Sequence, residues 1–287
     1  MSYTRSTTTP RRALRREVPS TVGLLADEED FAAMRRYRTF TFQDHARYLR
    51  QVEGLLKALA AQGGHTTVAL FDPEEYAEYC AGAGLDPDSP ATRSRFTAEV
   101  AATGARVTYT GQPMDNLLPQ LIGTAVRHAT WQYATTLLAV PPPGGTGEDA
   151  GRTAFDRASQ LLRRLLDAAG PGSHHLVCSI PVAGQRLTAV LRAERPTTGP
   201  ARLDSSEGAA FAIVLAAGIL HSSPGGVVLR TTTPAAPDRV HGWCLDHGRL
   251  RPLTEAQVFD AYCTDADTGE PLPPEPGVTY RAGFDLD

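Results

Sequence analysis

The first half of the chain alternates between helical and strand-like hydrophobic patterns. Between residues 43 and 61, apolar side chains recur at the spacing of one helix face, at Leu49, Val52, Leu56 and Leu59. Two runs rich in β-branched and aromatic residues then predict strands at 66–71 and 106–110. Because strands that are joined through helices usually lie parallel, we predict a Rossmann-like α/β half with parallel strands over residues 41–140.

The second half, residues 151–287, has the pattern of an α+β fold with mostly antiparallel strands. An amphipathic helix at 153–169 precedes two alternating runs that are separated by the short turn Ala183-Gly184-Gln185, which predicts a hairpin. The apolar run 209–220 predicts a buried helix, opened by a capping box that starts at Asp204. The expected elements that follow are a hairpin about Asp246-His247-Gly248, a helix at 254–262 and a strand at 278–284.

The predicted fold class is therefore α/β to α+β. The Pro/Gly-rich stretch 141–150 is expected to be a linker between the two halves, because it contains no apolar packing residue. Residues 1–40 are expected to form a basic, partly disordered arm. Whether the two halves share one sheet or form separate domains stays open.

Composition places the chain among globular proteins but says little about chemistry. Arginine supplies 27 of the 28 basic residues, and Lys57 is the only lysine. Together with much alanine, glycine and proline, this bias is typical of GC-rich, actinobacterial coding rather than of a mechanism. Four cysteines are scattered without a CxxC pair, which favours reduced thiols in a cytosol.

Two features predict a soluble, cytoplasmic protein that does not bind membranes. The first 20 residues lack the apolar stretch of a secretory signal. The longest apolar run, 209–220, is about half of the ~20 residues that span a bilayer.

Asp72 is the acidic residue whose position most resembles a functional one. It lies where a predicted parallel strand ends and a helix begins, which is the edge where open α/β sheets bind ligands. A carboxylate there can hold Mg²⁺, and Thr110 and Gly111 follow the neighbouring strand at what we expect to be the same edge. Asp before Pro-Glu-Glu is equally typical of a helix cap, and this interpretation is favoured.

Arginines form two candidate contacts for nucleic acid. Arg11, Arg12, Arg15 and Arg16 lie in the N-terminal arm, and Arg35, Arg36 and Arg38 surround Tyr37, which suggests phosphate pairing combined with base stacking. An isoelectric point near 6.1 is low for a dedicated nucleic-acid-binding domain. Nucleic acid therefore stays a weak alternative.

Three further motifs fail on their spacing. The acidic turn 265–270 lacks the order of an EF-hand loop, and 147–153 lacks the lysine and the preceding strand of a phosphate-binding loop. His241 and Cys244 are expected on opposite faces of a strand, which disfavours a zinc site. Any catalytic residue therefore stays unknown, and we predict no metal and no cofactor.

Three functions remain open. The favoured one is a non-enzymatic intracellular interaction or regulatory protein with a protein partner or self-association, because each candidate motif is also explained by caps and turns. The first alternative is a metal- or nucleotide-dependent enzyme with its site at the strand edge near Asp72. The second is a nucleic-acid-associated factor that uses the N-terminal arginines.

Overall fold

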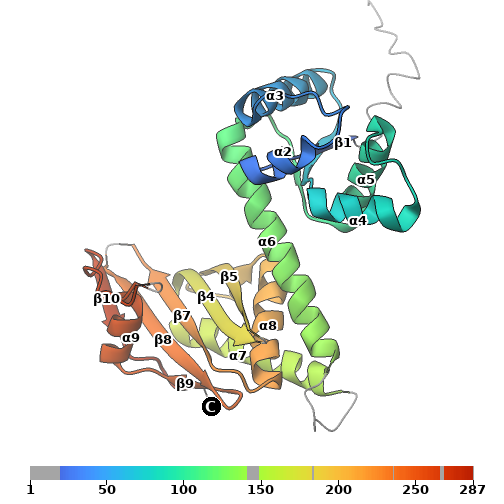
Figure 1. The fold of residues 1–287 in the computed structure, drawn as a ribbon. Coiled ribbons are helices and arrows are strands. Elements are labelled where there is room, and N and C mark those ends of the chain that lie inside the picture. The colour runs from blue at the N-terminus through green and yellow to red at the C-terminus, as the bar shows by residue number, and fades with distance from the viewer. Residues whose placement is uncertain (1–19, 141–148, 183, 235, 266–267, 287) are drawn as a thin grey trace, which may run out of the picture. The chain divides into compact units, whose positions relative to one another are not determined.

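A computed structural model describes residues 20–140, 149–182, 184–234, 236–265 and 268–286. Within these residues the fold is mixed α/β, with eight helices and ten strands in two sheets. The predicted fold class is confirmed (Figure 1). The chain divides into two compact units, Met1–His128 and Ala129–Asp287, which are described separately below.

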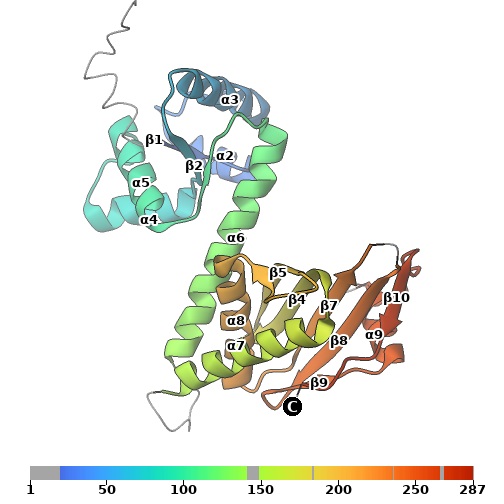
Figure 2. The same ribbon diagram turned by 180° about the vertical axis from the view of Figure 1, so that it is seen from behind.

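The first unit contains a three-stranded sheet in the order β1-β2-β3, with helices around it (Figure 2). Its elements are β1 (Ser20–Leu24), α2 (Glu28–Met34), α3 (His45–Ala61), β2 (Thr66–Leu70), α4 (Pro73–Ala83), α5 (Pro90–Thr103), β3 (Arg106–Thr108) and the first part of α6 (Met114–Ala139). Residues 20–34, which the sequence pattern had assigned to the arm, thus form a strand and a helix. Residues 1–19 and most of the predicted linker, 141–148, lie outside the described residues.

The parallel pair in this sheet is not the pair expected from the sequence. Strand β1 lies parallel to β2, whereas β2 and β3 are antiparallel, with Ala69 opposite Arg106. Two consecutive helices, α4 and α5, separate β2 from β3. The chain therefore returns to the carboxyl end of β2 before β3 begins, and the expected parallel pairing of 66–71 with 106–110 is wrong.

Aspartates fix the helix starts next to this sheet. Asp27, Asp44 and Asp72 each accept a hydrogen bond from a backbone N–H in the first turn of the following helix. Val22, Val68 and Val107 are aligned across the three strands, and they belong to or pack against the first unit's core. This core is rich in aromatic rings, which come mainly from Phe31, Tyr48, Phe71, Tyr76 and Phe96.

The second unit is a mostly antiparallel sheet in the order β10-β8-β7-β4-β5-β6, with β9 paired to β8. Its elements after α6 are α7 (Ala150–Ala169), β4 (Gly172–Val182), β5 (Gln185–Arg195), β6 (Arg202–Leu203), α8 (Ser205–Leu220), β7 (Gly225–Thr232), β8 (Asp238–Asp246), β9 (Arg249–Pro252), α9 (Glu255–Tyr262) and β10 (Val278–Arg281). Helices α7 and α8 cover one face, and α9 packs on the other (Figures 1 and 2).

The sequence predictions for this second unit are confirmed in most details. Strands β4 and β5 form the first hairpin, and β8 and β9 form the second, with His247 and Gly248 at positive φ in its turn. Helix α8 is buried along most of its length. At its start, Asp204 caps the helix as expected, but Glu207 accepts a hydrogen bond from Arg192 N instead of completing a capping box.

No helix in the described part of the chain has the length and apolar character needed to cross a bilayer.

Candidate functional site

The free edge of strand β1 is the most distinctive surface of the first unit. Ser20 N donates to His65 O and Phe71 N donates to Leu24 O, so the even-numbered residues of β1 direct their backbone groups toward β2. The backbone N–H and C=O groups of Thr21 and Gly23 therefore point away from β2, toward the free side of the strand. The N–H and C=O of Thr21 and the N–H of Gly23 have no hydrogen-bond partner among the described residues. An unpaired strand edge of this kind is a template for another strand.

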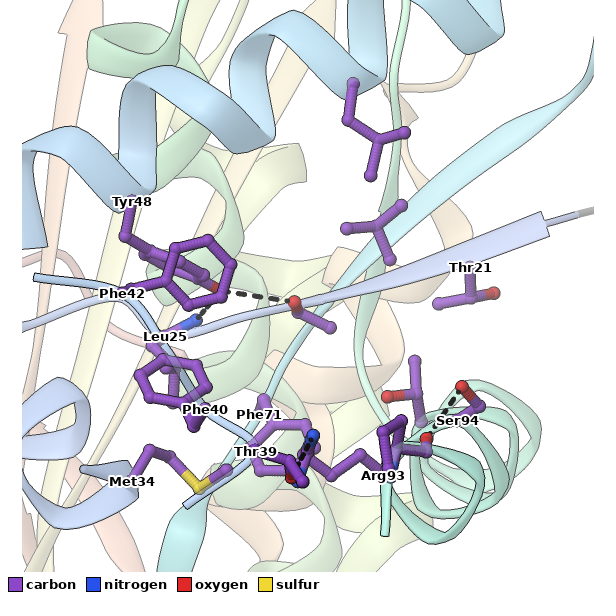
Figure 3. Close-up of a pocket in the computed structure, with 15 residues that line it drawn as sticks. Thr21, Leu25, Met34, Thr39, Phe40, Phe42, Tyr48, Phe71, Arg93 and Ser94 are labelled. Atoms are coloured by element: carbon purple, nitrogen blue, oxygen red, sulfur yellow. Dashed lines mark hydrogen bonds between the residues drawn. The ribbon is translucent and has the colours of Figure 1, made fainter. Parts of the chain in front are cut away.

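One end of this edge is closed by two side chains of α3. The Tyr48 hydroxyl accepts a hydrogen bond from Leu25 N at 3.2 Å and donates to Gly23 O at 3.5 Å (Figure 3). His45 Nε2 donates to Leu25 O at 3.1 Å. Burial raises the pKa of Tyr48 to about 12, so the hydroxyl keeps its proton at neutral pH. The open stretch of the edge is therefore confined to residues 21–23.

A cavity of about 420 Å³ lies along the open edge, with walls from both sides of the sheet. Figure 3 shows α3 with Tyr48 on one side of β1 and α5 with Arg93 and Ser94 on the other. The segment between α2 and α3 contributes further wall residues. The apolar side chains of the lining are Val22, Leu25, Met34, Phe40, Phe42, Leu55, Phe71 and Pro90.

Gly23 allows the helix to approach the strand closely at this cavity. A Cβ atom at this position would lie 2.9 Å from Thr97 Oγ1 and 3.0 Å from Phe71 Cδ2. Both neighbours line the cavity. The absence of a side chain at residue 23 thus determines how near α5 comes to β1 and, with it, the shape of the cavity.

The aromatic wall is held in place by polar contacts at the rim. Thr39 N donates to Asp88 Oδ1 at 2.8 Å, and this hydrogen bond is the main reason that the pKa of Asp88 lies below its ordinary value. Arg93 Nη2 donates to Thr39 Oγ1 at 2.9 Å. These contacts join the segment before α3 to α5 and so position Phe40 and Phe42, whose rings are 4.9 Å apart.

The chemistry of this cavity is that of a binding groove. Its floor offers backbone donors and acceptors, its walls are aromatic and aliphatic, and Arg93 is the charged side chain of its lining. No pair of side chains in the lining combines a nucleophile with a general base at hydrogen-bond distance.

The structure does not bring the predicted ligand-site residues together. Asp72 Oδ1 caps α4, accepting from Glu74 N at 2.7 Å and from Glu75 N at 3.1 Å. The N–H and hydroxyl of Thr110 bond to Gln112 Oε1, in a turn that Gly111 continues at φ 96°. Because Tyr109 N bonds to Thr66 O, Thr110 and Gly111 lie beyond the end of β2 that is opposite to Asp72. The antiparallel β3 is the physical reason for this separation.

Acidic side chains do gather at the carboxyl ends of β1 and β2. Burial, followed by the charges of Asp27 and Asp72, raises the pKa of Asp30 to about 6. Among the described residues, no group of three or more histidine, cysteine, aspartate or glutamate side chains is arranged to hold a metal ion. The carboxylates at this edge thus act as helix caps and as repelling neighbours.

We expect Asn at position 30 to stabilise the protein at neutral pH. The ordinary pKa of this carboxyl is 3.8, so the unfolded chain loses the proton first and stability falls as the pH rises through about 6. Asp30→Asn removes this penalty. Because the side chain is partly solvated, we expect a gain of about 1 kcal/mol at pH 7.5 that disappears near pH 4.

Thermal unfolding of both proteins between pH 4 and pH 8 measures this difference. Glu28→Gln is the control, since Glu28 lies in the same first turn and is exposed to solvent. A constant offset between the Asp30→Asn variant and the wild type at all pH values would contradict the prediction.

Two of the described arginines that were predicted to contact nucleic acid bond to other parts of the first unit. Arg36 Nη2 donates to Pro73 O, and Arg38 forms an ion pair with Asp88 at 3.3 Å. Arg35 is the C-cap residue of α2. Tyr37 is buried against Tyr76, so its ring is not presented for stacking on a base. The other four, Arg11, Arg12, Arg15 and Arg16, lie outside the described residues.

The groove could not be predicted from the sequence, because the pattern of β1 does not by itself indicate a strand. The run Thr21 to Leu25 is short, contains a glycine and follows a basic segment, which gave it the appearance of an arm. The sequence does contain a weak signal for this strand. It consists of the β-branched Val22 and of two leucines that precede Asp27, the N-cap of a helix.

Comparison with known proteins gives one match, which covers part of the chain and carries no function. A family model described as a domain of unknown function (DUF8829) matches residues 9–112. This range contains every residue that lines the groove. Comparisons with curated proteins and with solved structures gave no match.

Proposed function

We propose that this protein is a non-enzymatic interaction protein that binds an extended segment of a partner protein at the free edge of β1. The observation that supports this proposal is the set of unpaired backbone groups of Thr21 and Gly23 on the floor of an apolar-walled groove. Such an edge binds a peptide by adding it as a further strand. Backbone hydrogen bonds then give affinity, and the walls select side chains.

The groove favours a single segment over the sheet of a second copy. Residues of α3 and α5 line the cavity on either side of β1, so the edge is recessed between two helices. A second sheet with its own flanking helices would clash with these walls. An isolated extended segment has no such layers and fits between them.

The dimensions of the groove define the kind of segment that it accepts. The open edge offers three backbone groups, which is enough to pair with about three residues of a ligand strand. Alternate ligand side chains then face the two walls. The wall formed by Phe40, Phe42 and Leu55 favours a large apolar side chain. The proposed partner therefore contains a short, extended stretch with apolar residues at alternate positions.

A cytoplasmic partner is part of the proposal. All four cysteines are free thiols, and Cys80, Cys178 and Cys263 are buried. Proteins of oxidising compartments more often pair their cysteines in disulfides.

The experiment that tests the proposal starts from a phage-displayed library of random heptapeptides, selected against the full-length protein. Enriched peptides are then synthesised and added while amide hydrogen exchange is followed by NMR. We expect the amides of Thr21 and Gly23 to exchange at least tenfold more slowly with peptide. Val22 and Leu24 already donate within the sheet and should change little. Selection of no peptide, or binding that leaves Thr21 and Gly23 unprotected, would argue against the proposal.

We expect Leu55→Lys to weaken the binding of a selected peptide at least tenfold, or about 1.4 kcal/mol. Leu55 lines the groove and is 49% exposed, so the change removes apolar contact surface with little cost to the fold. Isothermal titration calorimetry measures the affinity. Leu272→Lys is the matched control, since Leu272 is 46% exposed and does not line the groove. Equal affinities of the two variants would contradict the assignment of the site.

A further inference from the structure

A row of threonines crosses the sheet of the first unit on the side that faces α5. The strand register places Thr21 opposite Thr67 and Thr67 opposite Thr108. The hydroxyl oxygens of Thr21 and Thr67 are 2.8 Å apart, and Thr67 is 93% buried. The neighbouring row, on the other face of the same strands, consists of three valines. The side under α5 is thus polar where a helix-covered sheet is ordinarily apolar.

The space above Thr21 and Thr67 is hollow. A cavity of about 450 Å³ lies between the strands and α5. The helix contributes Ser94, Ala98, Ala101 and Ala102 to its lining, at positions that recur on one helix face. Their short side chains do not reach the strands, so the cavity remains open. The lining thus combines the hydroxyl groups of Thr21, Thr67 and Ser94 with the methyl groups of three alanines.

The cavity is also lined by Arg106 and His65 but by no carboxylate. One Arg106 Nη1–H bonds to the carbonyl oxygen of Ala101, which leaves the other guanidinium donors available. Within the described residues, Arg106 forms no ion pair and the His65 ring has no hydrogen-bond partner. A guanidinium without a counter-ion beside hydroxyl groups is the arrangement that holds an anionic group.

We propose that the cavity under α5 binds a small hydrophilic molecule that bears a phosphate or carboxylate group. Arg106 and His65 contact the anionic group, and the hydroxyls of Thr21, Thr67 and Ser94 bond to hydroxyl groups of the ligand. This site is separate from the peptide groove in its ligand chemistry. It does not depend on the function proposed for that groove, although Thr21 and Ser94 line both cavities.

The test uses three probes on the full-length protein: inorganic phosphate, glycerol 3-phosphate and glycerate. NMR titrations at constant ionic strength, balanced with sodium chloride, follow the amides of Thr67 and Ala102 and the ring of His65. We expect saturable shifts with at least one polyol probe, and tighter binding of it than of inorganic phosphate. Glycerol 3-phosphate and glycerate distinguish a phosphate from a carboxylate ligand. Shifts no larger than those caused by sodium chloride for all three probes would overturn the proposal.

Two variants locate the site. Arg106→Gln should weaken binding at least tenfold, whereas Arg95→Gln, an exposed arginine on α5 outside the cavity, should leave it unchanged. Ala98→Leu fills the cavity without changing its charge, and should also abolish binding while the protein stays folded. Binding that survives both Arg106→Gln and Ala98→Leu would overturn the proposal even if the probes bind the wild-type protein.

Discussion

Trp243→Ala should lower the stability of the second unit by about 3–5 kcal/mol, which is the range for removal of a large buried aromatic side chain. Trp243 is 1% exposed and lies in β8 within the main core of this unit. Its ring packs edge-to-face on Phe284 at 4.8 Å, and its Nε1–H donates to Phe284 O at 2.9 Å. The substitution therefore removes core packing and also the contact that holds the last residues of the chain on the sheet.

Hydrogen exchange of the β7 and β8 amides measures the free energy with which this sheet opens. Trp131→Ala is the natural control, because Trp131 is the other tryptophan of the chain and is 41% exposed. We expect it to cost less than 1 kcal/mol. The loss of stability caused by Trp243→Phe should lie between those of Trp131→Ala and Trp243→Ala, since this variant keeps a ring but loses the hydrogen bond to Phe284 O. Similar losses for Trp131→Ala and Trp243→Ala would contradict the assignment of the core.

The second unit was predictable because its sequence signals are local. In β4 and β5, buried residues alternate with exposed or half-buried ones, and a short turn fixes the register of the two strands. Helix α8 is apolar nearly all round, which matches a helix enclosed by other elements. By contrast, the parallel pairing of β10 with β8 joins segments that are about 40 residues apart. No local pattern specifies such a pairing.

In the first unit, the direction and the order of the strands could not be predicted from local patterns. The strands 66–71 and 106–110 were located correctly, but the number of helices between them determines their relative direction, and two helices reverse it. The edge position of β1 follows from this topology and not from its own residues. Asp72 was interpreted correctly as a cap, because capping depends on the next three residues only. The groove and the threonine row arise from contacts between strands and helices, which spacing along the chain does not encode.

Gly23→Ala should destabilise the first unit and weaken peptide binding together. The added Cβ would lie 2.9 Å from Thr97 Oγ1 and 3.0 Å from Phe71 Cδ2, so one of these neighbours has to move. Insertion of a methyl group into such a tight contact costs about 1–3 kcal/mol. Because Thr97 and Phe71 both line the groove, we expect the affinity for a selected peptide to fall at least tenfold.

A second glycine, Gly54, should give the opposite result. Gly54 lies in α3 with no atom within 4 Å of an added Cβ, so Gly54→Ala should stabilise the protein by about 0.8–1 kcal/mol through helix propensity. Exchange of the Val22 and Leu24 amides reports the stability of the sheet in both variants. Stabilisation by Gly23→Ala would contradict the close contact between β1 and α5.

The contact between residue 23 and Thr97 is tested by removing Thr97 Oγ1, the atom nearest to the added methyl group. Thr97→Ala deletes Oγ1, which forms no hydrogen bond to the described residues, so alone it should change stability little. In the double variant, part of the loss caused by Gly23→Ala should return, with a coupling energy of about 0.5–2 kcal/mol. Peptide affinity should recover in parallel, because the close approach of α5 to β1 sets both the stability of the edge strand and the width of the groove. If stability recovered without affinity, the stability of the edge strand and the binding of the peptide would not depend on the same contact. The peptide would then bind elsewhere on the first unit.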